Sequence, residues 1–345
     1  MPQWSITRAL LPSLSVVDHA KEVQHYWTTL MKLWRVTGKR ATSSDFFPGC
    51  HPRSLSRDHL DTLGEHPYRV AYKSDGVRYV LLLTLRPGTR AEDGKAVALM
   101  IDRARTMYEV EVIAPEAYFA GGTVLEGELV WATQGACMHF LVFDALCVRG
   151  EALGHRPFDE RLEAACACVK WSEEISQADD PDAHAAEYDA LSMVHYDPRI
   201  VLASKTFANR ECAAALWRDR ARAGHRVDGL ILQRGDAPYH VGTAATECFK
   251  WKHEHTVDLA GPALRAADGL LPETLSDMPW SASPDSRLAA RNDGDVLEYL
   301  VRVVDGTRLE FFATRRRTDK TSANGICVVE AAVRELLAHV RVEEL

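Results

Sequence analysis

Two patterns of apolar and polar positions divide the chain. Residues 17–36 carry apolar side chains at mixed spacings of three and four, with Gly38 behind them, and predict an amphipathic helix. Residues 42–59 contain Pro, Gly and Ser and predict an irregular segment, with a short helix over 57–63. From Tyr68 the apolar residues lie close together and predict strands. These strands occupy 68–85, which one polar turn interrupts, a hairpin over 96–113, and the segments 123–132, 138–148, 227–233 and 246–260.

The composition changes twice in the second half of the chain. Residues 158–220 are rich in Ala and predict mostly helix, interrupted by an acidic, exposed stretch at 173–190. A shift to Pro, Gly, Ser and Asp near 256–262 predicts two domains, 1–258 and 259–345. The second, with about 85 residues, has the size of a small β-barrel. Its predicted elements are strands over 296–304 and 307–316 and a final amphipathic helix over 326–342.

Charge and composition exclude several classes of protein. Apolar residues make up 46% and charged residues 26%, as in soluble globular proteins, and the formal net charge is −8. An acidic chain is not a non-specific nucleic-acid coat, although a local basic cleft is compatible with it. We expect no membrane span and no secretory signal, because no apolar run is long enough and the first residues lack the order of a signal. Asp18 and Glu22 argue against a mitochondrial presequence.

Eight cysteines are scattered along the chain without any CxxC unit. A structural zinc site is therefore poorly supported. Their positions in apolar segments predict reduced, buried thiols in an intracellular protein. Cys166 and Cys168 are compatible with a redox or metal element, or with two small residues in a helix.

The segment Lys73-Ser74-Asp75-Gly76-Val77-Arg78 stands between two predicted strands. A lysine amine attacks phosphorus only when uncharged, so its pKa must fall below the usual value of about 10.4 through burial and nearby positive charge. Asp-Gly predicts a tight turn with a positive-φ position that puts the amine and Arg78 on one side. Arg78 can then bind phosphate or ribose with its planar fork. Taken alone, this short segment favours an exposed hairpin turn over a nucleophile.

Five further polar segments interrupt apolar runs. Each alone is compatible with an edge strand or a solvated face. Together they supply carboxylates for a divalent metal and cations for a triphosphate, which complete the parts of a phosphoryl-transfer site around Lys73. The five are Ile101-Asp102-Arg103, Leu125-Glu126-Gly127-Glu128-Leu129, Val227-Asp228-Gly229-Leu230-Ile231, Phe249-Lys250-Trp251-Lys252 and Arg315-Arg316-Arg317-Thr318-Asp319-Lys320.

In order and approximate spacing, these segments resemble the six collinear motifs of the covalent nucleotidyltransferase superfamily, which joins capping enzymes to ATP- and NAD-dependent ligases. Within it the chain resembles mRNA capping guanylyltransferases over roughly residues 44–335. The stretch from Phe47 to Arg57 is similar to a segment that these enzymes carry before the nucleophile. Lys250-Trp251-Lys252 with Thr256-Val257-Asp258 resembles their fifth motif, and Arg317-Thr318-Asp319-Lys320 with Asn324 their sixth. The implied fold is α+β, with a ligase-type, ATP-grasp-like nucleotidyltransferase domain of twisted antiparallel sheets and a C-terminal OB-fold β-barrel.

The resemblance implies a role for each matched residue around the nucleotide. Lys73 would form a phosphoramidate with GMP, and Arg78 and Arg103 would hold phosphate and ribose. Phe143 would stack on guanine, although the sequence alone is almost equally compatible with a core phenylalanine. Lys205 would approach the guanine O6 and help to exclude adenine.

The remaining matched residues would act on metal and phosphate. Glu128 would contact the ribose or help to order the metal, and Asp228 would assist metal binding and the chemistry. Lys250 and Lys252 would neutralise the α-phosphate. On the small domain, the residues that would grip the β,γ-phosphates and orient pyrophosphate are Arg317, Asp319 and Lys320.

The implied reaction is a two-step transfer that uses GTP and Mg²⁺ or Mn²⁺. Lys73 attacks the α-phosphate and pyrophosphate leaves, and the 5′-diphosphate end of RNA then takes GMP to form the cap. Closure of the small domain would serve the first step and its opening the second. Expected partners are GTP and 5′-diphosphate RNA, with a separate RNA triphosphatase, a cap methyltransferase and an RNA polymerase tail, and no membrane. The expected location is the nucleus, or the cytoplasm for a viral protein.

The sequence also departs from the family. Ala323 stands before Asn324 where a proline is usual, and the stretch 173–190 matches no motif and predicts an insertion. No His-Cys-x5-Arg phosphatase signature and no extra Glu-rich triphosphatase block is present, so we expect no fused triphosphatase. Two alternatives remain. An ATP-dependent polynucleotide ligase would use the same lysine chemistry, and a catalytically inactive module would recruit capping or transcription partners.

Overall fold

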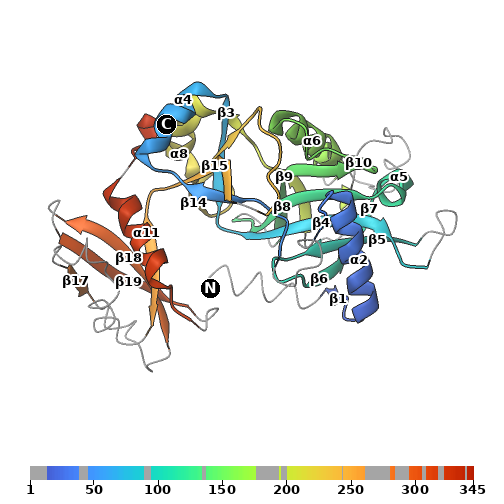
Figure 1. Cartoon of the computed structure of the whole chain (residues 1–345), viewed down its shortest axis with the longest axis horizontal. Helices are drawn as coiled ribbons and strands as arrows, with labels where there is room; N and C mark the ends of the chain where they lie inside the picture. The colour runs from blue at the N-terminus through green and yellow to red at the C-terminus, as the bar shows by residue number, and fades with distance from the viewer. Residues whose placement is uncertain are drawn as a thin grey trace. The chain divides into compact units, whose positions relative to one another are not determined.

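The structure is a computed structural model that divides the chain into two compact units. The first unit contains Met1–Arg53 and Glu65–Lys250, and the second contains Ser54–Gly64 and Trp251–Leu345. Figure 1 labels their elements. The structure describes residues 14–38, 46–88, 95–133, 137–175, 194–195, 200–242, 244–260, 280–283, 295–304, 308–317, 322–338 and 340–345.

A mixed sheet of eight strands forms the larger part of the first unit. Its neighbouring strands are antiparallel, except that β12 runs parallel to β9. The order across the sheet is β1-β6-β5-β4-β8-β9-β10, and β12 joins at β9. The strands are β1 (Ser15–Val16), β4 (Val77–Leu85), β5 (Ala96–Ile101), β6 (Met107–Val110), β8 (Thr123–Trp131), β9 (Met138–Val148), β10 (Glu151–Ala152) and β12 (Ile200–Ser204).

The central strand β4 is buried on both faces, which explains its unbroken apolar run. Side chains alternate along a strand, so Leu81 and Leu83 join one core, which includes residues of α5 (Glu116–Ala120) and α6 (Phe158–Ile175). Val80 and Leu82 join a second core with Tyr26 and neighbouring residues of α2 (Ala20–Leu33). Helices therefore cover both faces of this sheet (Figure 1).

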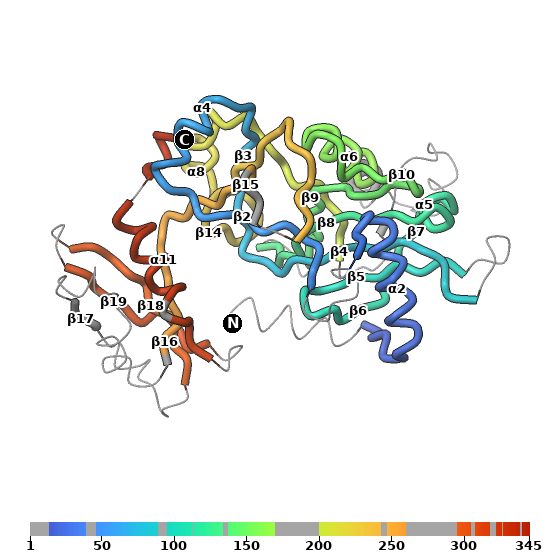
Figure 2. The backbone as a smooth tube through the Cα atoms, viewed as in Figure 1, coloured from blue at the N-terminus to red at the C-terminus, as the bar shows by residue number. Residues whose placement is uncertain are grey.

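A second, five-stranded sheet of the first unit has the order β13-β3-β14-β15-β2. Figure 2 shows β2 and β15 side by side at its edge. The strands are β2 (His51–Ser54), β3 (Tyr68–Ser74), β13 (Ala208–Asn209), β14 (Val227–Arg234) and β15 (Ala244–Lys252). β15 and β2 end in the second unit. The smaller elements are β7 (Val112–Ile113), which pairs with β11 (Val194–His195), together with η4 (Arg210–Cys212), α8 (Ala213–Arg218) and η5 (Arg220–Arg222).

The chain passes from one sheet to the other between β3 and β4, which takes Lys73 to the junction of the two sheets. The predicted positive-φ position is wrong, because Gly76 is not among the glycines with positive φ. Gly76 is required for space instead. A Cβ there would lie 2.6 Å from the backbone oxygen of Leu129 and 2.8 Å from Cγ of Glu128.

The second unit contains a four-stranded sheet of order β16-β18-β19-β17, and its core includes Val257, Leu297 and Phe311. Val329 and Val333 of α11 (Ile326–Leu337) complete that core. Among the described residues this sheet does not close into a barrel, because β16 and β17 each pair on one side only. The other elements are β16 (His255–Ala260), β17 (Trp280–Ser283), β18 (Val296–Val304), β19 (Arg308–Arg316), η2 (Arg57–His59), α4 (Leu60–Glu65) and η7 (Val342–Glu344).

Two secondary-structure predictions are corrected. The expected helical region 158–220 contains strand β12, which pairs with β9 and so leads directly to Lys205. The expected irregular segment 42–59 contains strand β2. The strands expected over 246–260 are β15 and β16. Most of the acidic stretch 173–190 lies outside the described residues. In the described part of the chain, no helix combines the length and apolar character that crossing a membrane requires.

The cysteines form no disulfide in the structure. Cys147, Cys168 and Cys248 are buried as expected, but Cys212 and Cys327 are exposed, so burial is not their common feature. Burial raises the pKa of Cys168 to about 12, which favours a thiol in the core over a metal ligand.

We predict that Leu30→Ala lowers the free energy of unfolding of the first unit by about 2–5 kcal/mol, because it opens a cavity between α2 and the large sheet. Leu30 has no exposed surface. The exposed Lys32→Ala on the same helix is the matched control. Urea unfolding followed by tryptophan fluorescence measures both, and equal effects of the two variants would contradict this packing of α2.

Candidate nucleotide-binding site

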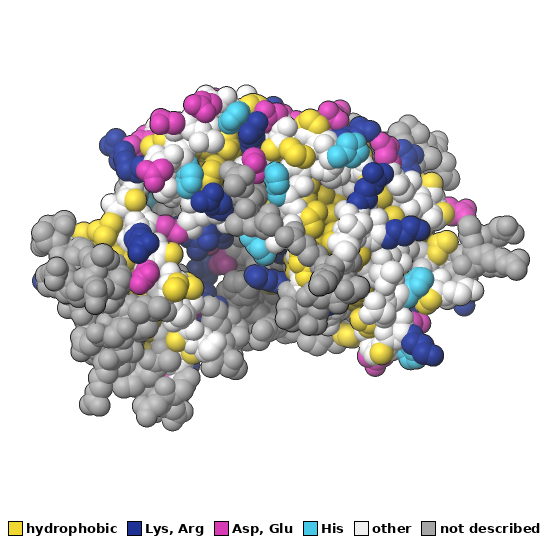
Figure 3. Space-filling model, in the orientation of Figure 1, with side chains coloured by type: hydrophobic (Ala, Val, Ile, Leu, Met, Phe, Trp, Pro, Cys, Tyr) yellow, Lys and Arg dark blue, Asp and Glu magenta, His cyan; other side chains and the backbone are white. Residues whose placement is uncertain are grey.

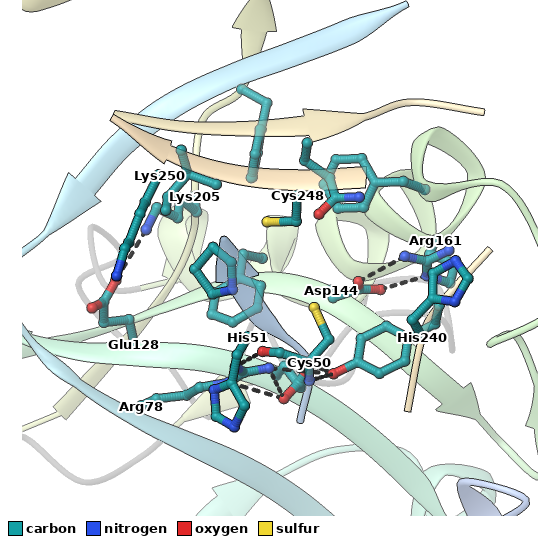
Figure 4. A pocket seen from close by; sticks show the side chains of 18 of the residues that line it. Cys50, His51, Arg78, Glu128, Asp144, Arg161, Lys205, His240, Cys248 and Lys250 are labelled. Carbon is teal, nitrogen blue, oxygen red and sulfur yellow. Dashed lines mark hydrogen bonds and ion pairs between the residues drawn. The ribbon is translucent and has the colours of Figure 1, made fainter. Parts of the chain in front are cut away.

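A pocket of about 480 Å³ lies between the two sheets of the first unit. Residues of the large sheet, such as Glu128 and Phe143, line it together with residues of the five-stranded sheet, such as His51 and Lys250. Figure 4 shows that Glu128 and Lys205 face each other on one side of the pocket, and Asp144 and Arg161 on another. The predicted site residues that line it are Lys73, Arg78, Arg103, Glu128, Phe143, Lys205 and Lys250.

Lys73 forms an ion pair with Asp228. Its Nζ donates to Oδ1 at 2.7 Å and to Oδ2 at 2.8 Å. The pairing of β3 with β14 shifts between Val227 and Gly229, and the extra residue of this bulge is Asp228. The bulge therefore aims the carboxylate at the amine. Both oxygens of the carboxylate hold the amine, so the amine must leave this pair before it can act as a nucleophile.

Lys205 is 7% exposed and donates to Oε2 of Glu128 at 3.0 Å. Its Nζ lies 5.7 Å from the ring centroid of Phe143, and Cζ of Arg78 lies 5.5 Å from that centroid. Phe143 is half-buried and lines the pocket, so it is not the core phenylalanine that the sequence left open. An aromatic face flanked by two cations can stack on a flat, electron-rich base.

Arg78 is bound by the protein itself. Its Nε donates to Oε1 of Glu126 at 3.1 Å, and its Nη2 donates to the hydroxyl of Tyr239 at 3.3 Å. It also donates to the carbonyl oxygen of Cys50. Burial lowers the pKa of Arg78, but the Glu126 carboxylate, together with Tyr239 and Cys50, more than offsets this and raises the pKa above its ordinary value. In this structure the guanidinium therefore anchors the wall of the pocket.

Glu126, which sequence reasoning did not select, has no exposed side-chain surface. It accepts hydrogen bonds from Arg78 and from the hydroxyl of Tyr239, and that hydroxyl accepts from the amide of Cys50 at 2.8 Å. Burial and the nearby Glu126 raise the pKa of Tyr239 well above its usual value, so it remains a neutral donor. The two carboxylates of Leu125-Glu126-Gly127-Glu128-Leu129 thus have separate partners.

A second buried pair supports the opposite wall. Arg161 donates to Asp144 through Nε at 2.8 Å and through Nη2 at 3.0 Å, and the two side chains are 1% and 5% exposed. Arg161 also donates to the carbonyl of Ala237 at 3.0 Å, and its Cζ lies 5.4 Å from the ring centroid of Tyr239. Asp144 interrupts the apolar run 138–148, a signal that could have identified it. Arg161 stands in an ordinary amphipathic helix and gives no such signal.

His51 lies at a positively charged end of the pocket. Burial lowers its pKa, and Arg103, Arg78 and Lys250 lower it further. Arg103 is exposed in the turn after β5, not on the strand as predicted, and the turn is closed by Asp102 Oδ1, which accepts from the amide of Thr106 at 2.8 Å. Three cations around a neutral imidazole form an environment that suits an anion such as a phosphate group.

Among the described residues, three of the predicted ones do not line this pocket: Asp228, and Lys252 and Arg317 of the second unit. Asp319 and Lys320 lie outside the described residues. Arg317 donates to Asp258 through Nη1 at 2.8 Å and 2.9 Å. The backbone amide of Asn324 donates to the carbonyl of Asp258 at 2.7 Å. The segments that resemble the fifth and sixth motifs of the family therefore meet within one unit.

The carboxylates present suit a shared metal site but not a cage made only by the protein. Among the described residues, no cluster of three or more His, Cys, Asp or Glu side chains could hold a metal ion. Mg²⁺ commonly binds one or two carboxylates together with substrate phosphates. Asp228 and Glu128 are the predicted carboxylates, and each is paired with a lysine here. The donor set therefore fits a cation that arrives with a nucleotide.

The arrangement defines a class of site. One lysine stands at the junction of two sheets, cations gather around one end of the pocket, and an aromatic face borders it. Such a site can bind a nucleoside triphosphate and present an amine to its phosphates.

A model of the family described as mRNA capping enzyme, catalytic domain, matches residues 8–254. The chain belongs to this family. It is 30% identical over 288 residues to mRNA-capping enzyme subunit alpha of Neurospora crassa, which covers 75% of this chain and 66% of that protein. It is 27% identical over 350 residues to mRNA-capping enzyme subunit alpha of Schizosaccharomyces pombe, which covers 90% and 82%.

The chain spans about half of another relative, the mRNA-capping enzyme of Caenorhabditis elegans, with 25% identity over 314 residues and coverage of 84% of this chain and 47% of that protein. Among solved structures, mycobacterial DNA ligase D complexed with ATP and MES aligns with a TM-score of 0.42 and 16% identity over 81% of this chain and 97% of that chain.

We predict that Glu126→Ala destabilises the first unit by about 3 kcal/mol, because it leaves the guanidinium of Arg78 without its buried carboxylate. The control is Glu151→Ala, which breaks an exposed pair with Arg156 and should cost about 0–1 kcal/mol. Urea unfolding measures both. A loss below about 1 kcal/mol for Glu126→Ala would contradict the structural role of the pair.

His225 makes the stability of the fold depend on pH. Burial and the cation of Lys205 lower its pKa from 6.5, while its Nε2 lies 2.9 Å from Oγ of Ser74. The unfolded chain therefore binds a proton at a higher pH than the folded chain, and stability falls as pH drops through about 6.5. We predict that His225→Gln reduces this loss between about pH 7.5 and 5.5, measured by urea unfolding. The exposed His19→Gln is the control, and an unchanged slope in His225→Gln would refute the assignment.

Proposed function

We propose that this chain is an mRNA guanylyltransferase. It transfers GMP from GTP through a lysyl-GMP intermediate on Lys73 to the 5′-diphosphate end of RNA and forms the GpppN cap. The observation that carries the proposal is the position of the Lys73 amine in a cation-lined pocket between two sheets, in a chain of the capping-enzyme family. The capping activity that the names of the relatives state supports the same reaction.

The base and ribose occupy the part of the pocket between Phe143 and Glu128. The guanine ring stacks on Phe143, which is worth about 1–3 kcal/mol but reads no base identity. Lys205 donates to the guanine O6, an acceptor that adenine lacks, and so favours GTP over ATP. The ion pair of Lys205 with Glu128, at 3.0 Å, keeps the ammonium beside the ring of Phe143 and supports this role.

The triphosphate occupies the positive end of the pocket. Arg103 and Lys250 bind phosphate oxygens there, and the lowered pKa of His51 beside them keeps the imidazole neutral at pH 7. Arg78 acts through its fixed position in the wall as much as by contact with ribose or phosphate, because Glu126 holds it.

Asp228 and Glu128 would hold Mg²⁺ or Mn²⁺, which would supply positive charge to the phosphates during transfer. Asp228 also controls the amine of Lys73, with which it is paired at 2.7 Å. When this carboxylate turns to another cation, the amine loses its counter-charge and can give up its proton. The neutral Nζ then attacks the α-phosphorus, the bond to the β-phosphate oxygen breaks, and pyrophosphate leaves.

In this proposal the second unit contributes residues that bind the phosphates of the nucleotide. Residues 259–345, which make up most of this unit, belong to the OB-fold domain, and residues 1–258 belong to a ligase-type nucleotidyltransferase domain, although Trp251–Asp258 pack with the second unit. The four-stranded sheet with α11 is compatible with part of such a domain. Arg317, Asp319 and Lys320 contact the β,γ-phosphates, and Lys252 joins Lys250 at the α-phosphate. The paired Arg317 and Asp258 provide a fixed base for that contact.

The proposed cellular context follows from the reaction. The RNA acceptor is supplied by a separate RNA triphosphatase, and a cap methyltransferase acts on the product. Docking to an RNA polymerase tail and location in the nucleus complete this proposal.

We predict that Lys73→Ala abolishes covalent labelling by α-labelled GTP with Mg²⁺ or Mn²⁺, because no other amine replaces it. A denaturing gel detects the adduct. Lys32→Ala, at an exposed position of α2, is the matched lysine control and keeps the labelling. A labelled band that survives in Lys73→Ala would refute the assignment.

The same assay decides the nucleotide. Parallel reactions with α-labelled ATP test the ligase alternative, and labelling by ATP in place of GTP would refute the proposed guanine selectivity. Absence of labelling with either nucleotide would favour an inactive recruitment module.

A further inference from the structure

An arginine-rich segment lies directly before β14. Residues Trp217–Arg226, with the sequence WRDRARAGHR, contain four arginines and one aspartate. With neutral histidine the segment carries four positive charges less one, or +3, in a chain of net charge −8. The exposed arginines of this segment are Arg218, Arg220, Arg222 and Arg226. Solvated charges are common, so their position and chemistry must decide whether they bind a partner.

The segment is fixed beside the turn that follows Lys73. The carbonyl oxygen of Arg226 accepts from the amide of Asp75 at 2.9 Å, and its Nε lies 3.1 Å from Asp75 Oδ2. The next residue, Val227, pairs with Ser74. On the other side, the carbonyl of Gly224 accepts from the amide of Thr133 at 2.7 Å, just after strand β8. The arginines are therefore held at a constant position relative to the proposed nucleophile.

The chemistry of the segment suits a nucleic-acid backbone. Guanidinium groups bind phosphate oxygens in a planar, two-pronged geometry. Cζ of Arg220 lies 4.3 Å from the ring centroid of Trp217, and its Nη1 donates to the Trp217 carbonyl at 2.8 Å. Cations interleaved with an aromatic ring are typical of surfaces that bind single-stranded nucleic acid.

We propose that Arg218, Arg220 and Arg222 bind the phosphates of the acceptor RNA that follow its 5′ diphosphate. This inference rests on the proposed guanylyltransferase function and adds a binding surface to it. In the second step the 5′ end of RNA must reach the nucleotide on Lys73, so its next phosphates pass close to that residue. Contacts to phosphate carry no sequence information, as an enzyme that accepts many transcripts requires.

An acidic or phosphorylated protein segment is the other polyanion that this surface could bind. The position of the segment favours RNA, because a partner seated beside the turn that follows Lys73 would obstruct the acceptor. Binding of RNA and binding of a protein segment predict different effects on the transfer of GMP to RNA. The experiment below distinguishes them.

We predict that the triple variant R218Q/R220Q/R222Q forms lysyl-GMP at the wild-type rate but transfers GMP poorly to a long acceptor. Arg226 is left intact because it supports the turn at Asp75. With purified lysyl-GMP enzyme and subsaturating 5′-diphosphate RNA of about 20 nucleotides, transfer should fall about tenfold. The slope of log kcat/KM against log salt should become shallower by about 2, from three contacts of about 0.7 each. Transfer to a 5′-diphosphate dinucleotide, which is too short to reach all three arginines, should be unchanged.

The control variant K21Q/K32Q/K95Q removes the same charge from exposed positions on α2 and before β5 and should leave both transfers unchanged. Equal transfer to the long RNA by wild type and triple variant would overturn the proposal and leave these arginines as a solvated face. If that transfer is unchanged while binding of an acidic phosphopeptide is lost, the surface binds a protein segment and the RNA proposal fails. If the triple variant lost transfer to the long RNA and to the dinucleotide equally, the proposal would also be overturned. Failure of the wild type to form lysyl-GMP would instead refute the proposed function.

Discussion

The passage of the chain from one sheet to the other between Ser74 and Val77 is the constraint on which the site depends. Strand β3 belongs to the five-stranded sheet and β4 to the eight-stranded sheet, and the connection between them passes against Leu129 and Val130 of β8. Gly76 permits this, because any side chain there would collide with the backbone of Leu129. Lys73 lies in β3 just before this crossing, and Arg78 lies in β4 just after it. The two cations therefore reach one pocket from different sheets.

Paired charges then give the pocket its shape. Desolvated ions are costly unless they are paired, and the walls contain two buried arginine–carboxylate pairs, one at Glu126 and one at Asp144. Tyr239 contacts both pairs, by a hydrogen bond to Glu126 and by its ring beside Arg161. These pairs keep fixed geometry without a ligand. The carboxylates paired with Lys73 and Lys205 are more exposed than Glu126 and Asp144, so these two pairs can separate when a cation or a base binds.

The sequence predicted the participants of the site better than their contacts. Polar residues in apolar strands identified Lys73, Glu128 and Lys250, and the pocket contains all three. The bulge that aims Asp228 at Lys73 depends on the register between strands about 150 residues apart, which no local pattern specifies. Pairing between strands far apart in the sequence also explains why β12, which ends just before Lys205, was predicted as helix. Its Ala-rich neighbourhood favoured helix, and pairing with β9 overrode that preference.

The acidity of the whole chain and the binding of polyanions are compatible because charge acts locally. Figure 3 shows acidic and basic side chains intermixed over the upper part of the face that it displays, so their fields largely cancel beyond a Debye length of about 10 Å. In the pocket, the imidazole of His51 has its pKa lowered by burial and by three cations, which reports a positive field at short range. Outside it, the arginines of Trp217–Arg226 extend positive charge from the turn beside Lys73 into solvent. Positive charge near Lys73 therefore attracts both a nucleotide in the pocket and a polyanion on the neighbouring surface.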